Sequence, residues 1–540
     1  MKNIRKTAVF ASLLLFGAAG CADLDVDNTN QPDRAGALRT AGDIESLISG
    51  TFSTWFHNQH NNTHSCANSP GVWMGIASFQ GSNSWNNCAA NPYSQIPRPA
   101  LTNAPADANY NTIAQPWYAN YRAIAAVSQG LAALAADPEL EDDLSASDLA
   151  RLKAFGKFML GLGHATLATV YDRAFIVDET TDLSAGTELQ PYGEVMTAAL
   201  GYFDEAAALS SGESFTIPSL WVGASITNVQ LAKIARGLKA RYRASVARTT
   251  AERDAVDWAA VLTDLAAAGG QEWTMEHDWV NWWSNNVFWQ SGYGYAWLSY
   301  QYYGMADQSG RYQTWLGMTV NSRHPNLGGA DNTTAFIIVT PDLRFAQGAT
   351  RTAQAAAPGR YFRIPEYSIT GQWARPDRGT WRWSWYRNHK FDALNDAGDT
   401  YRLLPRSELR LLAAEALLRT GNGAAAADSI NVSRVFNGLN ATNSSGLNTS
   451  CVPKLPSSAC GGLLHILAWE VWMETMMEGH FGSPKYFFDR RNGFLYKNTA
   501  LQMPIPAKEL QLLQLTPVYT YGGGGDGSAP TSAFAFPHEG

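Results

Sequence analysis

Alanine-rich segments with apolar residues at spacings of three and four restrict the fold of this chain more than any other feature. They cover residues 117–135, 149–170, 192–209, 228–246 and 258–268, and the spacing predicts amphipathic helices. Residues 43–56 contain no alanine but also have a helical pattern. Small residues recur on the faces expected to be buried, where they let neighbouring helices approach closely: Ala165, Ala168, Ala206, Ala207, Ala232 and Ala235. Stacked helix pairs like those of tetratricopeptide repeats suit such faces, although no regular period of about 34 residues is present.

The middle of the chain differs in composition from these segments. Over residues 271–400 Trp, Tyr, Asn and Gly become frequent, as in WVNWWSNNVFWQSGYGYAW, and the helical periodicity mostly disappears. A long irregular region in a compact protein is usually functional or contains short elements of its own. Helical patterns return at residues 406–418, 424–436 and 463–478.

These segments predict a mainly α fold with a loop-rich face. We expect a single domain over residues 41–540, although a chain of 540 residues exceeds what one hydrophobic core usually fills and two domains are the alternative. The helical scaffold would comprise about 41–268 and 400–515, and the aromatic loop-rich region about 271–400. A flexible tail, opened by the glycines at 522–525, would cover 522–540.

The N-terminus indicates export. A basic start, an apolar stretch from Ala8 to Phe16 and small residues up to Gly20 predict a signal peptide over residues 1–20, too short to span a bilayer. Cys21 follows directly, which resembles a bacterial lipobox in which the thiol is acylated. Ala18 stands where Leu or Val is more usual, so ordinary cleavage of a soluble protein is the alternative. Residues 21–40 would form the lipidated N-terminus and an acidic tether, since their aspartates lack the glycine and glutamate of a calcium-binding EF-hand loop.

The other cysteines fit an oxidising compartment. Cys66, Cys88, Cys451 and Cys460 form an even set, and sequence alone leaves three pairings open. Proximity favours Cys66 with Cys88 and Cys451 with Cys460, each closing a short polar loop. Zinc ligands would need tighter spacing, so we expect no metal at these positions.

The charge balance excludes one class of partner. The formal net charge is −7 and only 16% of residues are charged, so the chain lacks the basic footprint of a nucleic-acid-binding protein. After residue 20 no apolar stretch approaches the length of a membrane span.

Two C-terminal motifs resemble those of the SusD/RagB-like outer-membrane lipoproteins. In the first, an Arg-containing strand leads into a helix with "AEA" and a second helix with "IN.VR...GL". The matching residues are Arg402, Glu408, Leu411, Ala414, Glu415, Ala416, Gly421, Ala427, Ile430, Asn431, Arg434, Gly438 and Leu439. The second motif is matched by Glu470, Glu474, Glu478, Gly479, Phe488, Asp489, Arg490 and Arg491, then by Pro504, Ile505, Pro506 and Glu509. A short insertion, His480 to Lys485, departs from the family pattern. The similarity covers most of residues 21–510.

This resemblance implies a surface-exposed, lipid-anchored outer-membrane protein without catalytic activity or cofactor. Such a protein binds glycans or other oligomeric nutrients and delivers them to a partner TonB-dependent transporter, over which it sits as a lid. The resemblance also implies tetratricopeptide-like helix pairs on one side and a loop-rich ligand face on the other.

Carbohydrate chemistry suggests where a ligand would bind. Sugar rings stack on flat aromatic side chains while amides and charged groups satisfy the hydroxyls. The two segments that combine these groups supply the candidate residues Trp73, Asn83, Trp85 and Asn86, and Trp282, Trp283, Asn285, Asn286, Trp289, Tyr295 and Trp297. For any one tryptophan, half-buried support of a loop is the competing interpretation.

Two other groups of residues have chemical potential. His57, His60 and His64 have helical spacing and could bind a metal, but the neighbouring asparagines favour a polar loop. Glu470, Glu474 and Glu478 fall on one face of a predicted helix and could serve as acid and base in a glycosidase. Because Arg490 and Arg491 follow closely, we expect a structural ion-pair cluster.

An all-helical surface glycoside hydrolase that uses loop carboxylates is therefore the alternative function. The chain contains no G-x-S-x-G elbow, P-loop or H-E-x-x-H motif, so the common hydrolase and nucleotide-binding signatures are absent.

The lipobox interpretation predicts that Cys21 is acylated and holds the protein in the outer membrane. A palmitate analogue should label the wild type and fail to label Cys21→Ser, which should appear in the soluble fraction. Equal labelling of the two proteins, or labelling of neither, would contradict acylation at this cysteine.

Overall fold

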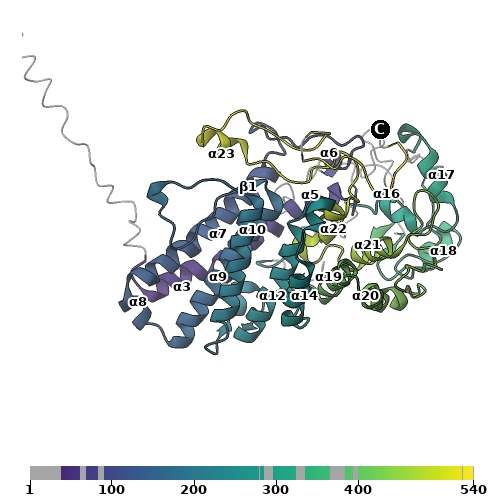
Figure 1. Cartoon of the computed structure of the whole chain (residues 1–540). Helices are drawn as coiled ribbons and strands as arrows, with labels where there is room; N and C mark the ends of the chain where they lie inside the picture. The colour runs from purple at the N-terminus through teal and green to yellow at the C-terminus, as the bar shows by residue number, and fades with distance from the viewer. Residues whose placement is uncertain are drawn as a thin grey trace, which may run out of the picture.

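The computed structural model of the protein describes residues 38–60, 69–82, 90–278, 280–284, 287, 296–323, 335–364, 384–392, 399–525 and 527–538. The architecture is mainly α, with short two-stranded sheets, as the sequence predicts (Figure 1). Residues 1–37, with Cys21, lie outside the described part.

The long helices of the N-terminal half lie side by side (Figure 1). They are α3 (Ala41–Ser49), α4 (Thr51–His60), α7 (Asn111–Ala136), α9 (Ala146–Val170), α10 (Tyr192–Leu209), α12 (Asn228–Ser245) and α14 (Trp258–Ala268). α3 and α4 pack on α7, and from α7 onward each long helix packs on the next. Shorter elements connect them: α5 (Pro70–Ala77), α6 (Ala90–Ser94), α8 (Pro138–Asp142), α11 (Ser219–Val222), α13 (Thr250–Asp254) and the 3-10 turn η3 (Leu183–Ala185).

A second group of helices forms the C-terminal half. It consists of α19 (Arg406–Arg419), α20 (Gly423–Phe436), α21 (Leu463–Glu474), the 3-10 turn η9 (His480–Gly482), α22 (Pro484–Asn492) and α23 (Ala507–Leu512). α19 packs against α20 and α21, and α21 packs against α22. Because α14 also packs on α19, the row of helices continues from one half of the chain into the other.

The region between the two halves contains only short elements among its described residues. They are α16 (Tyr300–Tyr303), η4 (Gly304–Ala306), α17 (Arg311–Gly317), η5 (Val320–Arg323) and α18 (Arg351–Ala356). The strands pair in antiparallel fashion: β1 (Arg173–Ala174) with β2 (Gln190–Pro191), β3 (Thr216–Ile217) with β4 (Ile226–Thr227), β5 (Trp273–His277) with β8 (Asp399–Leu404), and β6 (Phe362–Arg363) with β7 (Arg387–Asn388). The β5–β8 pair thus joins the start and the end of the loop-rich region.

Local signals explain where the helices begin and end. Thr227 and Gln230 form a capping box at the start of α12, and Asp257 accepts a hydrogen bond from the backbone N–H of Ala260 at the start of α14. α14 ends at Ala268 and is capped by Gly269, whose left-handed conformation (φ 59°) suits glycine.

The predicted helices agree with the structure except at particular boundaries. α10 and α14 coincide with the predicted segments. The predicted helix over 43–56 is instead two helices separated at Gly50, and the predicted helix over 463–478 ends at Glu474, which leaves Glu478 beyond it. Within the part of the chain that the structure describes, no helix is both long and apolar enough to cross a membrane.

Small residues allow the long helices to approach closely. Ala165, Ala168, Ala206 and Ala235 are fully buried, whereas Ala232, also expected to be buried, is only partly so. One such close approach is at Gly163 of α9, where an added Cβ would lie 2.8 Å from Cγ1 of Ile124 on α7. A larger side chain there would require the Ile124 side chain to move.

Buried arginines connect the N-terminal helices to the C-terminal ones. Arg241 of α12 makes a bidentate ion pair with Glu408 of α19, with N–O distances of 2.8 and 2.7 Å. Arg490 of α22 donates to the backbone carbonyls of Thr169 at 3.0 Å and of Ser245 at 2.6 Å. The guanidinium groups therefore satisfy carbonyls near the ends of α9 and α12 and fix the two halves against each other.

The C-terminal segment differs from the expected flexible tail. Gly522 forms a β-bridge with Ala100, and Ser528 forms one with Ala500. Phe534 and Phe536 are buried in the main hydrophobic core, which runs from residue 44 to residue 536. Over its described residues the segment is packed, because its aromatic side chains enter the core.

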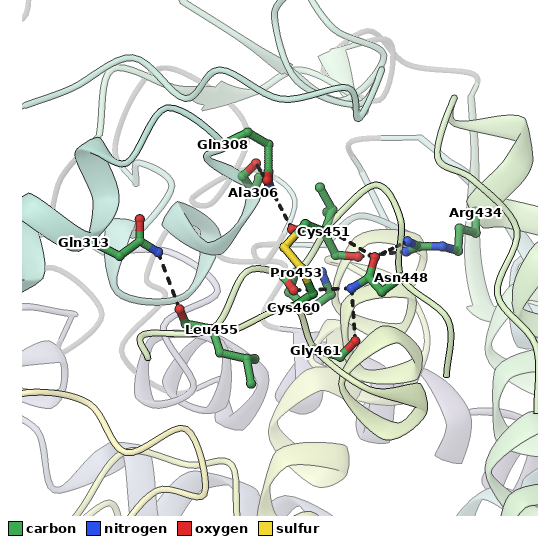
Figure 2. The surroundings of a disulfide bond; sticks show 11 residues. Ala306, Gln308, Gln313, Arg434, Asn448, Cys451, Pro453, Leu455, Cys460 and Gly461 are labelled. Atoms are coloured by element: carbon green, nitrogen blue, oxygen red, sulfur yellow. Dashed lines mark hydrogen bonds between the residues drawn. A yellow bond between two sulfur atoms is a disulfide. The ribbon is translucent and has the colours of Figure 1, made fainter. Parts of the chain in front are cut away.

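A disulfide closes one loop of the C-terminal half (Figure 2). Cys451 is bonded to Cys460, which confirms one predicted pair. The backbone carbonyl of Cys451 accepts a hydrogen bond from Gln308 at 2.8 Å, so the closed loop is held against the segment that follows η4. Cys66 and Cys88 lie outside the described residues, and their pairing stays a prediction.

The close contact of α7 and α9 predicts opposite effects for two glycine substitutions. Gly163→Ala should destabilise the protein, because overpacking costs about 1–3 kcal/mol and exceeds the gain of about 0.5–1 kcal/mol from replacing a helical glycine. Gly201→Ala in α10 is the matched control, since nothing lies within 4 Å of its added Cβ, and it should stabilise the protein. Urea denaturation measures both changes; a stabilised Gly163→Ala variant would disprove the tight contact.

Candidate functional site

The structure describes only some of the residues that the sequence suggests as ligand contacts. Asn83, Trp85, Asn86, Asn285, Asn286, Trp289 and Tyr295 lie outside the described residues. The structure places Trp73 on α5, and it places Trp282, Trp283 and Trp297 in the chain between β5 and α16.

The fold brings the two aromatic segments together. Ser82, within the first segment, and Trp297, at the end of the second, form an antiparallel β-bridge. The bridge has two backbone hydrogen bonds, from Ser82 N–H to Trp297 O at 2.9 Å and from Trp297 N–H to Ser82 O at 3.0 Å. The two stretches that carry the predicted ligand groups therefore join at a common base, although about two hundred residues of chain lie between them.

The start of the second segment is held by a compact turn. The carboxylate of Asp278 accepts hydrogen bonds from the backbone N–H groups of Val280, Asn281 and Trp282, at 2.9, 2.9 and 2.7 Å. His57 of α4 donates through its Nε2 to the backbone carbonyl of Asn281 at 2.8 Å. Since α4 belongs to the helical scaffold, this contact attaches the turn to the rigid part of the protein.

The four candidate tryptophans that the structure describes are all buried. Trp73, Trp282, Trp283 and Trp297 expose 2%, 8%, 3% and 2% of their surface. The ring of Trp282 packs against Phe52 at 5.6 Å and Phe56 at 5.5 Å. Such rings do not offer a face for stacking on a sugar, so this burial favours loop support as their role. A ligand-binding role stays a prediction for the candidates outside the described residues.

Of the three histidines with helical spacing, the two that the structure describes, His57 and His60, make structural contacts. His57 and His60 lie on α4 and not in a polar loop, and His57 is used in the contact with Asn281. His60 is buried and stacks on Phe56 with ring centroids 4.6 Å apart, and burial lowers its pKa to about 3. His64 lies outside the described residues. Both described rings contact Phe56, His57 at its edge and His60 by stacking.

The three glutamates of the second motif are ion-paired, as expected, but with other partners. Buried Arg344 donates to Glu470 and Glu474 at 2.9 and 3.0 Å and to Asp342 at 2.8 Å. Glu478 instead pairs with Arg402 at 2.8 Å and Lys390 at 3.3 Å.

Arg490 and Arg491, which we expected near these carboxylates, point elsewhere. Arg490 donates to backbone carbonyls, and Arg491 pairs with Glu415 of α19. The sequence could not identify Arg344 because 126 residues separate it from Glu470.

Arg344, Asp342, Glu470 and Glu474 form what we call the Arg344 cluster, and its electrostatics indicate a structural role. Burial alone would lower the pKa of Arg344, but the carboxylates of Asp342 and Glu470 raise it well above its ordinary value. Burial raises the pKa of Glu470, and Arg344 opposes that change. Glu474 also accepts hydrogen bonds from Tyr361 at 2.9 Å and Asn437 at 3.2 Å. With their oxygens used in this way, the carboxylates lack the freedom of a glycosidase acid–base pair.

The structure brings together two arginines that we did not identify as candidates from the sequence. Arg363 of β6 and Arg387 of β7 are paired residues, and both contact Asp392, at 3.5 and 2.8 Å. Arg387 directly follows Tyr386. The backbone of Ser384 and Tyr386 is hydrogen-bonded to the backbone of Leu298, which follows Trp297. The run RNHKF at residues 387–391, which follows an aromatic segment, was the available signal in the sequence.

Solved structures of SusD superfamily proteins share this fold. One from Bacteroides vulgatus has a TM-score of 0.54 and 15% identity, covering 88% of this chain and 97% of its own. A SusD homolog from Parabacteroides distasonis has a TM-score of 0.54 and 12% identity, covering 91% and 98%. Surface glycan-binding protein A from Bacteroides uniformis has a TM-score of 0.52 and 13% identity, covering 88% and 99%. No family model and no curated protein matches the sequence.

The Arg344 cluster predicts a large and pH-dependent loss of stability when the cation is removed. Arg344→Met should destabilise the protein by about 3–5 kcal/mol, because it leaves buried carboxylates without a counter-charge. Lys153→Met, which breaks the half-exposed pair with Glu141, is the control and should cost at most about 1 kcal/mol.

The pH dependence distinguishes this mechanism from a simple packing defect. Without Arg344 the folded-state pKa of Glu470 rises further above its unfolded value, so the folded variant binds protons more tightly and gains stability as the pH falls. The deficit relative to wild type, measured by urea denaturation, should therefore shrink between neutral and acidic pH. A deficit that is constant with pH would refute the electrostatic explanation.

Proposed function

We propose that this chain, whose fold is that of the SusD superfamily, is a surface-exposed lipoprotein that binds glycans or other oligomeric nutrients. It delivers them to a partner TonB-dependent outer-membrane transporter and has no catalytic activity of its own. The fold is the premise; the ligand, the lipid anchor and the transporter are the proposal.

The backbone bridge between Ser82 and Trp297 is the observation that carries the ligand proposal. It gives a common base to the two segments that combine flat aromatic rings with amides. Aromatic faces provide stacking area for the C–H faces of sugars, and amides provide both donors and acceptors for hydroxyls. Trp85 and Asn86 of the first segment and Trp289 and Tyr295 of the second supply these groups.

The similar structures add support of a different kind. The Bacteroides uniformis protein is named as a surface glycan-binding protein, and another structure with this fold is named as laminarin-binding. These names describe those proteins. We extend glycan binding to this chain because its own aromatic and amide residues have suitable chemistry.

The anchoring and delivery steps rest on the sequence. The small residues before Cys21 and the acidic stretch after it are consistent with a lipidated N-terminus and a tether. A stable anchor needs two acyl chains or more, which an acylated N-terminal cysteine of a lipoprotein carries. A tethered protein at the outer surface would hold captured oligomers next to the transporter.

This proposal predicts which aromatic residues matter for binding. Trp85→Ala or Trp289→Ala should weaken the affinity for a glycan found by array screening of residues 22–540 about tenfold, since one stacked ring contributes on the order of 1 kcal/mol. Phe436→Ala on α20 is the matched control, because its ring is 67% exposed but lies outside both segments, and it should bind like the wild type. Calorimetry that finds unaltered affinity in both tryptophan variants would remove the proposed site.

The same protein distinguishes binding from hydrolysis. The wild type should release no shorter products from the bound glycan, and Glu474→Gln should bind it with unchanged affinity. Hydrolysis by the wild type that Glu474→Gln abolishes would establish the glycoside hydrolase instead.

A further inference from the structure

An open cleft lies on the helical scaffold, apart from the aromatic segments. It has a volume of about 630 Å³ and is formed by α7, α9 and α10 together with the end of α8 and the loop after α9. Leu131 and Ala135 of α7 and Ala208 and Leu209 of α10 supply its apolar walls. This volume falls within the range of about 300–1,000 Å³ that is usual for ligand sites.

The lysines of the cleft are already neutralised. Lys157 of α9 pairs with Glu179 at 2.5 Å and with Glu205 at 2.7 Å. Lys153, one turn earlier, pairs with Glu141 at 2.6 Å. The lining thus has two lysines against three glutamates, a net charge of −1. An anionic ligand would have to displace these glutamates from the lysines.

The surroundings of the cleft add more negative charge. α8 and its flanks, next to Glu141, carry Asp137, Glu139, Asp142 and Asp143, all exposed to solvent. α8 lies at the end of the helical row, between α7 and α9 in the chain (Figure 1). A positively charged partner would be attracted to this end, and the attraction would decrease with salt.

The chemistry of the cleft does not suit a sugar. No aromatic ring and no side-chain amide is among the residues that line it, so it lacks the groups that stack on and hydrogen-bond to a glycan. The cleft is also open to solvent, whereas a pocket for a small molecule encloses most of its ligand. An open apolar cleft suits a side chain that is part of a larger molecule, which makes further contacts outside it.

We propose that this cleft docks a basic segment of a partner protein. An aliphatic side chain of that segment inserts between Leu131 of α7 and Leu209 of α10. Lysines or arginines beside it contact Glu205 and the carboxylates of α8. This site is independent of the glycan-binding role, because it shares no residue with the aromatic segments.

Fluorescence anisotropy with defined peptides tests the proposal on residues 22–540. The probe is a fluorescein-labelled peptide that alternates lysine and leucine, and its counterpart alternates glutamate and leucine. We expect the basic peptide to bind and to lose affinity as salt is raised, and the acidic peptide to bind at least about tenfold more weakly. Equal binding of the two peptides, or no binding of the basic one, would overturn the proposal.

Two variants locate the binding on the protein. Ala208→Trp fills the cleft and should weaken binding of the basic peptide at least about tenfold, whereas Ala424→Trp, at another exposed helical alanine on α20, should leave it unchanged. Both variants should keep the melting temperature and the glycan affinity of the wild type. Unaltered peptide binding by Ala208→Trp would place the peptide elsewhere and refute the site.

The alternative occupant of the cleft is a second copy of this chain. Sedimentation of the wild type should show a monomer over the concentrations used for anisotropy. Self-association that Ala208→Trp abolishes would assign the cleft to a homodimer contact and overturn the proposed heterologous partner.

Discussion

The structure depends on buried guanidinium groups that connect helices distant in sequence. Arg241 on α12 reaches Glu408 on α19, and Arg490 on α22 reaches carbonyls near the ends of α9 and α12. A buried guanidinium whose partners move loses charge-assisted hydrogen bonds that water cannot replace, at a cost of several kcal/mol. The N-terminal and C-terminal helices therefore have one relative arrangement. Arg490 belongs to the second family-like motif and Glu408 to the first, so both motifs contribute to holding the scaffold together.

A rigid scaffold gives the irregular region fixed points of attachment. β5 and β8 pair the two ends of that region, His57 holds the turn at Asn281, and Ser82 pairs with Trp297. The tryptophans nearest these attachments, Trp282 and Trp297, are buried and help to anchor the loops. Glu470 and Glu474, candidates for an acid–base pair in the sequence, are held by Arg344 inside the fold. Attachment of variable loops to a constant base is a common way to build specificity.

The aromatic segments and the cleft of α7, α9 and α10 differ in chemistry, so the partners proposed for them differ. The aromatic segments combine rings and amides, which recognise neutral polar molecules. The cleft of α7, α9 and α10 combines aliphatic walls with paired and unpaired carboxylates, which attract cations. The two proposals place an oligomeric ligand and a protein segment at separate sites, which share no residue.

The sequence by itself determined the helices, because their spacing of apolar residues and their caps are local. α10 and α14 were predicted at their observed bounds, and the strand before α19 and the Cys451–Cys460 pair were also predicted. The spacing of apolar residues predicted one helix across Gly50, where the chain forms two. It also predicted that the helix ending at Glu474 would continue to residue 478.

Only the tertiary structure decided which residues meet across long separations. Arg344 lies far from Glu470 in sequence, so nothing local identified it as the partner, and the nearer Arg490 and Arg491 were chosen wrongly. The burial of Trp73 and Trp297, and the packing of Phe534 and Phe536 in place of a flexible tail, likewise depend on the surfaces that surround them. A ring's exposure and a charge's partner are properties of the assembled core, because packing and desolvation act between segments that only folding brings together.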